Sequence, residues 1–167
     1  FIHFRRSNKF IINMKPAAVF KQLSIIHIAI CLGTCIIVGT LYTLKMQANE
    51  VISSEDGMNI LELLVPVLGV TTFAAAYYIG RRKIKAVPKE SNLVNKLEAY
   101  KSFNILIWAA LEGSTFFAAI AFYLTGRMNL LLYALMLGVL LIYFRPLKTR
   151  AKEELNLSAV EGDELDL

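Results

Sequence analysis

One carboxylate lies inside a long apolar stretch of this sequence, where it needs a chemical reason. Glu112 falls near the middle of 101–127, KSFNILIWAALEGSTFFAAIAFYLTGR. An ionised carboxylate at the centre of a bilayer costs at least about 2.5–3.5 kcal/mol. Glu112 is therefore expected to be protonated or to face hydrogen-bond donors inside a helix bundle. Such an acid is typical of proton or cation sites within membranes.

Three threonines are the candidate partners of Glu112. Counting about 1.5 Å of helical rise per residue inward from the predicted helix ends places Thr71, Thr72 and Thr34 level with the carboxylate. No arginine or lysine falls at that depth, so an internal salt bridge is not expected.

Small residues surround Glu112 in the sequence. The pairs Ala109-x3-Gly113 and Ser114-x3-Ala118 would let another helix approach closely. Three interpretations of Glu112 stay open: a neutral side chain bonded across a tight helix contact, a proton or cation site, and a contact in an oligomer interface.

His27, Cys31 and Cys35 recur at i+4 spacing, and their nitrogen and sulfur atoms would suit zinc or copper. One helix cannot enclose an ion, and the other apolar runs contain no further His or Cys. We therefore expect no metal and no cofactor; the cysteines act as small apolar residues, and His27 bonds a neighbouring helix or interfacial water. The sequence shows no nucleophile–base pair, which argues against an enzyme.

Glu62 is the second acid near an apolar run. With a helix expected to begin at Asn59, Glu62 would lie in the first turn, where the helix dipole and headgroup water stabilise a carboxylate. The alternative interpretation is a carboxylate at the mouth of an ion path.

The elements that must position these residues are membrane helices. Hydrophobic residues make up 56% of the 167 positions and the mean hydropathy is +0.54, well above the values of soluble domains. The sequence predicts an all-α integral membrane bundle of four transmembrane helices, arranged as two antiparallel hairpins. The predicted spans are 23–44, 59–80, 102–125 and 129–144 within a transmembrane domain at 14–150.

Charge gives the expected topology. The net charge is +5, but the basic residues gather at helix ends, so positive flanks of membrane helices explain them better than nucleic acid. The expected location is the bacterial inner (plasma) membrane. The positive-inside rule places the loop after the second helix, and both termini, on the cytoplasmic side of this membrane. Besides the bilayer itself, the expected partners are anionic lipid headgroups, which would bind Arg81, Arg82, Lys83 and Lys85, and possible further copies of the chain or another membrane protein.

The two ends of the chain are expected to lie outside the bundle. Residues 1–13 precede Met14 and are predicted to be an upstream or disordered segment, or a basic arm at the membrane surface. Residues 151–167 are acidic with isolated leucines, which predicts a disordered cytoplasmic tail, or alternatively a docking peptide.

The segment LEAYKSFNILIWAALEGSTFFAAIAFYLTG, with the later RPLK and EELNLS, resembles an uncharacterised family of small four-span bacterial inner-membrane proteins. The resemblance covers Met14 to the tail, and its most specific features are Glu112, Gly113, Arg145 and Pro146. It implies a four-span fold without implying an activity.

Two characterised families resemble this sequence in having one glutamate buried in a membrane helix. ALEG is similar to the carboxylate context of rotary-ATPase proteolipids, although this chain lacks their glycine-repeat helices and carries its acid in the third span. Small multidrug carriers have four spans and one essential glutamate, but in the first helix. The sequence thus favours a structural or accessory membrane component. The alternative is a proton- or cation-coupled small transporter or channel subunit that uses Glu112.

Overall fold

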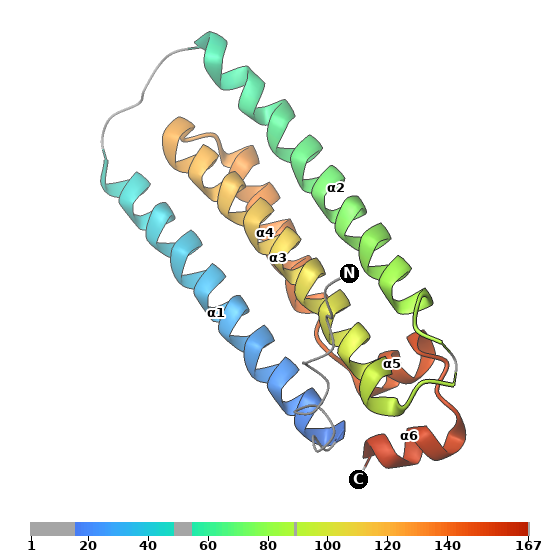
Figure 1. The fold of residues 1–167 in the computed structure, drawn as a ribbon. Coiled ribbons are helices and arrows are strands. Elements are labelled where there is room, and N and C mark those ends of the chain that lie inside the picture. Colours follow the sequence, from blue (N-terminus) through green and yellow to red (C-terminus); the bar gives the residue numbers. More distant parts are fainter. Residues whose placement is uncertain (1–15, 49–54, 89, 167) are drawn as a thin grey trace, which may run out of the picture.

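The chain is all-helical in the part that the computed structural model describes, residues 16–48, 55–88 and 90–166 (Figure 1). The predicted fold class is confirmed. The helices are α1 (Pro16–Gln47), α2 (Glu55–Lys85), α3 (Leu93–Thr125), α4 (Met128–Tyr143), α5 (Lys148–Glu154) and α6 (Ala159–Asp166). The segment predicted at 1–13 lies outside the described residues.

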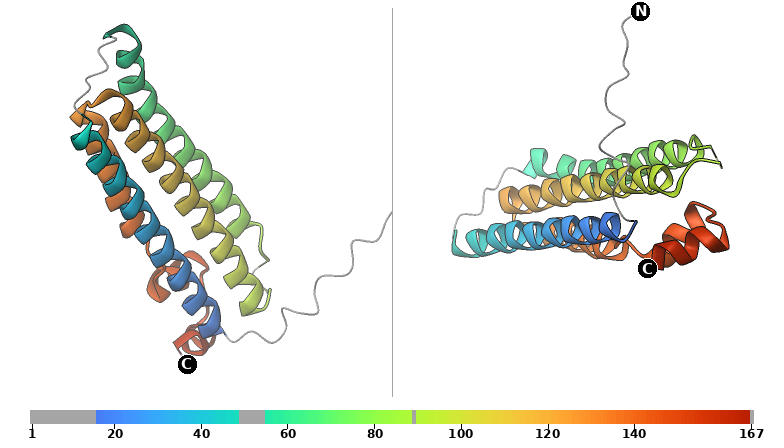
Figure 2. Two further views of the ribbon diagram at one scale, coloured as in Figure 1. Left: turned by 90° about the vertical axis from the view of Figure 1, so that its left-hand side faces the viewer. Right: turned by 60° about the horizontal axis from the view of Figure 1, so that its bottom comes forward.

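Helices α1 to α4 run alternately up and down, and α3 packs against each of the other three. The layers are α2 with α3 and α1 with α4 (Figure 2). The α3–α4 pair is a tight hairpin, whereas α1 and α2 touch each other little and pack mainly against α3. Helix α3 is therefore the centre of the bundle.

Local sequence signals define both ends of α3. Asn92 caps its start, accepting a hydrogen bond at 3.0 Å from the backbone N–H of Asn95. Gly126 ends it with a φ of 72°, in the left-handed region that glycine adopts without strain, and its N–H donates to the carbonyl of Phe122. Since α3 has 33 residues, it is about 50 Å long and extends beyond the hydrocarbon core of a bilayer.

The helices have the dimensions of a membrane protein. Helices α1, α2 and α3 are long and apolar enough to cross a bilayer. Helix α4 has only 16 residues, and it forms a fourth candidate span together with α5, from which it is bent by 80°. The chain is a helical membrane protein with three to four candidate spans.

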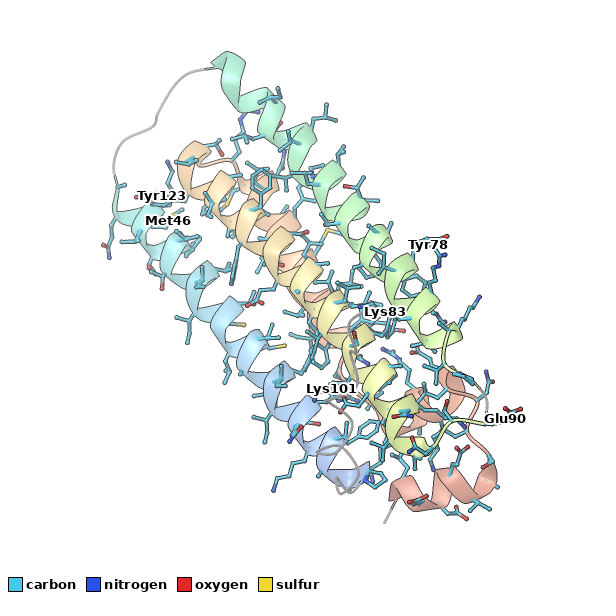
Figure 3. All side chains as sticks on the ribbon, viewed as in Figure 1. Met46, Tyr78, Lys83, Glu90, Lys101 and Tyr123 are labelled. Atoms are coloured by element: carbon cyan, nitrogen blue, oxygen red, sulfur yellow. The ribbon has the colours of Figure 1, made fainter. Side chains whose placement is uncertain are left out.

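Large apolar side chains cover the outside of the bundle. Ile36, Leu63, Val70, Tyr78 and Val139 are each 66–69% exposed. Tyr78 points away from the helices (Figure 3). A surface of this kind is stable against lipid hydrocarbon and would be unfavourable in water.

The end of the chain differs from the predicted disordered tail at 151–167, because α5 and α6 fold against the bundle. Leu165 is fully buried, and Leu155 and Leu157 are partly buried against the same apolar cluster. The Nζ atom of Lys96 lies 2.6 Å from Oε1 of Glu161. The isolated leucines form no core of their own; they add to one that the start of α3 already provides.

Two local motifs shape this end. Ser158 and Glu161 form a capping box at the start of α6: Oε2 of Glu161 accepts the Ser158 N–H at 2.9 Å, and the Ser158 hydroxyl accepts the Glu161 N–H at 3.4 Å. Asn156 has a φ of 48°, and the N–H of Leu157 donates to the carbonyl of Lys152, which is the Schellman ending of α5.

Candidate functional site

Helix α3 has one face that the other helices leave uncovered. Ile105, Ala109, Gly113 and Ile120 are exposed on it, and Glu112 is half-buried at its edge. The exposed residues are four, four and seven positions apart, so they lie on one side of the helix. We call this set the open face of α3. Figure 1 shows α3 itself between α1 and α2.

Glu112 has no hydrogen bond or ion pair with any residue that the structure describes. Beside it, a Cβ atom added to Gly113 would meet nothing within 4 Å. The carboxylate thus lies at the surface of the bundle next to open space.

None of the three threonines expected beside Glu112 is hydrogen-bonded to it in the described structure. Thr71 and Thr72 donate to carbonyl oxygens four residues earlier in α2, at 2.7 and 2.6 Å. Thr72 does reach α3, where its hydroxyl lies 2.9 Å from that of Ser114. Thr34 is buried, and its hydroxyl has no partner among the described residues. The count of helical rise gave depth along each helix but not the direction around it.

Four polar side chains on the covered side of α3 are hydrogen-bonded to their own helix. Asn104, Ser114, Thr115 and Thr125 each donate to the carbonyl oxygen four residues earlier, at 2.8 Å. These bonds satisfy the donors of the polar side chains, but they do not connect the side chains into a continuous polar path along the bundle.

The carboxyl end of α4 is held by side chains of two other helices. His27 Nε2 lies 3.0 Å from the carbonyl oxygen of Leu141, and since a carbonyl only accepts, His27 donates this bond. Trp108 Nε1 donates to the carbonyl of Phe144 at 2.8 Å. Carbonyls at a helix end lack helical partners, and within a membrane they need protein donors.

The hydrogen bond expected from His27 to a neighbouring helix is confirmed. The role of Trp108 was not anticipated, although a buried indole N–H generally needs a partner, which is a usable signal. Cys31 Sγ lies 3.7 Å from His27 Nε2, while Cys35 is exposed. Within the described ranges, His, Cys, Asp and Glu side chains form no group of three that could hold a metal ion.

An apolar groove of about 450 Å³ separates α1 from α4. Its lining includes Thr34, Cys35 and Gly39 from α1 and Ala134 and Gly138 from α4. The groove is almost without polar surface, so lipid hydrocarbon is a suitable filling.

Glu62 is paired rather than free. Its Oε2 lies 2.9 Å from Nη1 of Arg127, which joins α2 to the α3–α4 turn. Because α2 begins at Glu55, Glu62 lies beyond the first turn, and the expected interaction with the helix dipole gives way to this ion pair. A cleft of about 410 Å³ adjoins the pair, with Asn129 and Tyr133 in its lining.

Basic residues gather where α2 ends. Arg81 Nε donates to the hydroxyl of Tyr77 at 3.1 Å, and its guanidinium lies 5.4 Å from the centre of the Tyr77 ring. Arg82, Lys83 and Lys85 are exposed. Cations next to tyrosine are typical of a membrane–water interface.

Comparisons with protein-family models, with curated proteins and with solved structures give no match to this chain. Function is therefore argued from the residues themselves. Among the features above, the open face of α3 combines a carboxylate within a candidate membrane span, which has no hydrogen-bond or ion-pair partner among the described residues, with room for another helix. The chain is a helical membrane protein, and this face is its strongest candidate site.

Proposed function

We propose that this protein is a structural or accessory membrane component that works by associating with other membrane proteins through helix packing. The observation that carries the proposal is the position of Glu112, half-buried on the open face of α3 beside Gly113. A polar group at a helix surface in lipid, next to a small residue, suits helix association. We also propose that the protein is not an enzyme.

The interior of the bundle supports this choice over transport. A proton or cation path would need polar groups that link mid-depth to both ends. Ser114 and Thr115 bond to carbonyls of α3, and Thr72 bonds to Ser114 and to its own helix. Glu62 is neutralised by Arg127.

We propose the bacterial inner membrane as the location, with both ends of the chain in the cytoplasm. The exposed cations Arg82, Lys83 and Lys85 support this orientation, because they lie at the same end of the bundle as the start of α1 and as α6 (Figure 1). At that surface each would attract anionic lipid headgroups by about 1 kcal/mol.

One observation favours a second candidate function, a proton- or cation-coupled transporter or channel subunit. Glu112 lacks a bonding partner among the described residues, so its carboxyl group would be available to exchange a proton or to bind a cation. Intramembrane carboxylates commonly serve such functions.

Reconstitution in proteoliposomes separates the two functions. Proton and sodium fluxes would be measured for the parent chain and for Glu112→Gln, with Glu98→Gln, the same chemical change near the start of α3, as the control. The accessory function predicts the same flux for all three as for empty vesicles. A flux through the parent that Glu112→Gln abolishes and Glu98→Gln retains would contradict it and support transport.

A further inference from the structure

We propose that the partner of the open face of α3 is a second copy of this chain. Two copies would associate about a twofold axis along the membrane normal, with the two Glu112 carboxyl groups protonated and hydrogen-bonded to each other. This inference rests on the proposed function, since it names the partner for the association surface described above.

Glu112 needs a polar partner from outside the described chain. No described residue bonds to it, and lipid tails offer neither donors nor acceptors. A polar group without a partner in hydrocarbon costs several kcal/mol. A covering surface that brings a hydrogen-bonding group to this depth removes that cost.

A neutral carboxyl group is complementary to a second copy of itself. It carries one O–H donor and a carbonyl acceptor, so two such groups face to face form two reciprocal hydrogen bonds. A twofold interface places each residue near its own copy. With the axis along the membrane normal, both Glu112 side chains lie at one depth, where they can meet.

The open face of α3 has room for the close approach of another helix. Ala109 and Gly113 are small and exposed, and a Cβ atom on Gly113 would meet nothing within 4 Å. Inside the bundle the situation is reversed, because a Cβ atom on Gly80 would overlap the ring of Phe103.

Cysteine cross-linking in membranes tests the geometry. In a background with Cys31→Ala and Cys35→Ala, single cysteines would replace Ala109 on the open face or Ala74, an exposed alanine of α2. A disulfide forms only where the two Cα atoms come within about 7 Å. Mild oxidation is expected to give disulfide dimers with Ala109→Cys and monomers with Ala74→Cys.

Equal cross-linking of the two variants, or none at Ala109→Cys, would overturn the proposal. Cross-linking of Ala109→Cys to a different protein in native membranes would also overturn it, while the accessory function would stand. A Glu112-dependent flux would instead contradict the accessory function, so the two failures are distinguishable.

Substitution of Glu112 tests the chemistry. Dimer formation would be measured by energy transfer between labelled copies in vesicles at several lipid-to-protein ratios. Glu112→Gln keeps a donor and an acceptor and is expected to dimerise like the parent. Glu112→Val loses both, so its dissociation constant is expected to rise about tenfold.

The fluorescence of Trp108, the single tryptophan, would confirm that each variant is folded. A folded Glu112→Val chain that dimerises as tightly as the parent would overturn the role of the carboxyl groups.

Discussion

Polar side chains on the two sides of α3 differ in whether they have hydrogen-bond partners. On the covered side, Ser114 and Thr115 donate to carbonyls of their own helix at 2.8 Å. On the open face, Glu112 has no partner among the described residues and Gly113 adjoins empty space. The hydroxyl groups of Ser114 and Thr115 are thus bonded within one chain, whereas we propose that Glu112 finds its partner in a further molecule. In a membrane bundle, the position of a polar residue around its helix thus decides whether it serves packing or association.

The largest expected effect compares two glycines. Gly80→Leu places side-chain atoms where the ring of Phe103 already lies, so we expect a loss of about 3 kcal/mol in the free energy of unfolding. The matched change on the open face, Gly113→Leu, meets no described atom and should leave the stability of the monomer unchanged or slightly higher.

Both free energies would be measured by denaturant titration in micelles at a protein concentration that keeps the chain monomeric. A similar cost at the two glycines would mean that the open face is covered within the monomer.

The next effect concerns the donors to the end of α4. His27→Phe leaves the Leu141 carbonyl without its donor, and an unsatisfied buried acceptor costs about 1–3 kcal/mol. His27→Gln retains an N–H donor and should recover part of this loss. Thermal unfolding followed by Trp108 fluorescence measures the stability of both variants. Equal stability of His27→Phe and the parent would show that this hydrogen bond does not stabilise the fold.

The smallest effect concerns a carboxylate that has a partner, in contrast to Glu112. The hydrogen bond from Lys96, and then that from the Ser158 N–H, lower the pKa of Glu161 below its usual value. A carboxylate with a lowered pKa in the folded state stabilises that state above the usual pKa, and this contribution is lost as the pH falls through the lowered value. Acid should therefore loosen the docking of α6.

Thiol labelling of Leu165→Cys, a fully buried position, in a chain without other cysteines would report this loosening. Glu161→Gln should increase labelling at neutral pH by no more than about fivefold, because the pair is only partly buried and the glutamine oxygen can still accept a hydrogen bond from Lys96. It should also weaken the pH dependence. Labelling of the parent that stays constant on acidification would contradict the contribution of Glu161.

Much of the fold could be predicted from sequence because it depends on local signals. Long apolar runs predicted the helices, and the predicted fourth span at 129–144 ends one residue after α4, whose last residue is Tyr143. The capping box of Ser158 and Glu161 was also readable and marks a helix where a disordered tail was expected. The burial of Leu165 could not be read locally, because its contacts come from distant parts of the chain.

The candidate site was predicted only in part. Glu112 stands out in any apolar run, but its surroundings depend on the rotation of α3 about its axis. Ala109-x3-Gly113 and Ser114-x3-Ala118 are equivalent in the sequence, and packing alone decides that Gly113 is exposed and Ala118 is buried. The satisfied hydroxyl groups of Thr71 and Thr72 likewise follow from bonds to their own helix.

The position of the open face can be measured directly by spin labels on single cysteines in α3. At a high lipid-to-protein ratio, where the chain is monomeric, lipid-dissolved oxygen would be used to relax each label. The account predicts high oxygen accessibility at Ala109, Gly113 and Ile120 and low accessibility at Leu111 and Ala118. High accessibility at Leu111 and Ala118, with protection at Gly113, would place Glu112 inside the bundle and contradict the account.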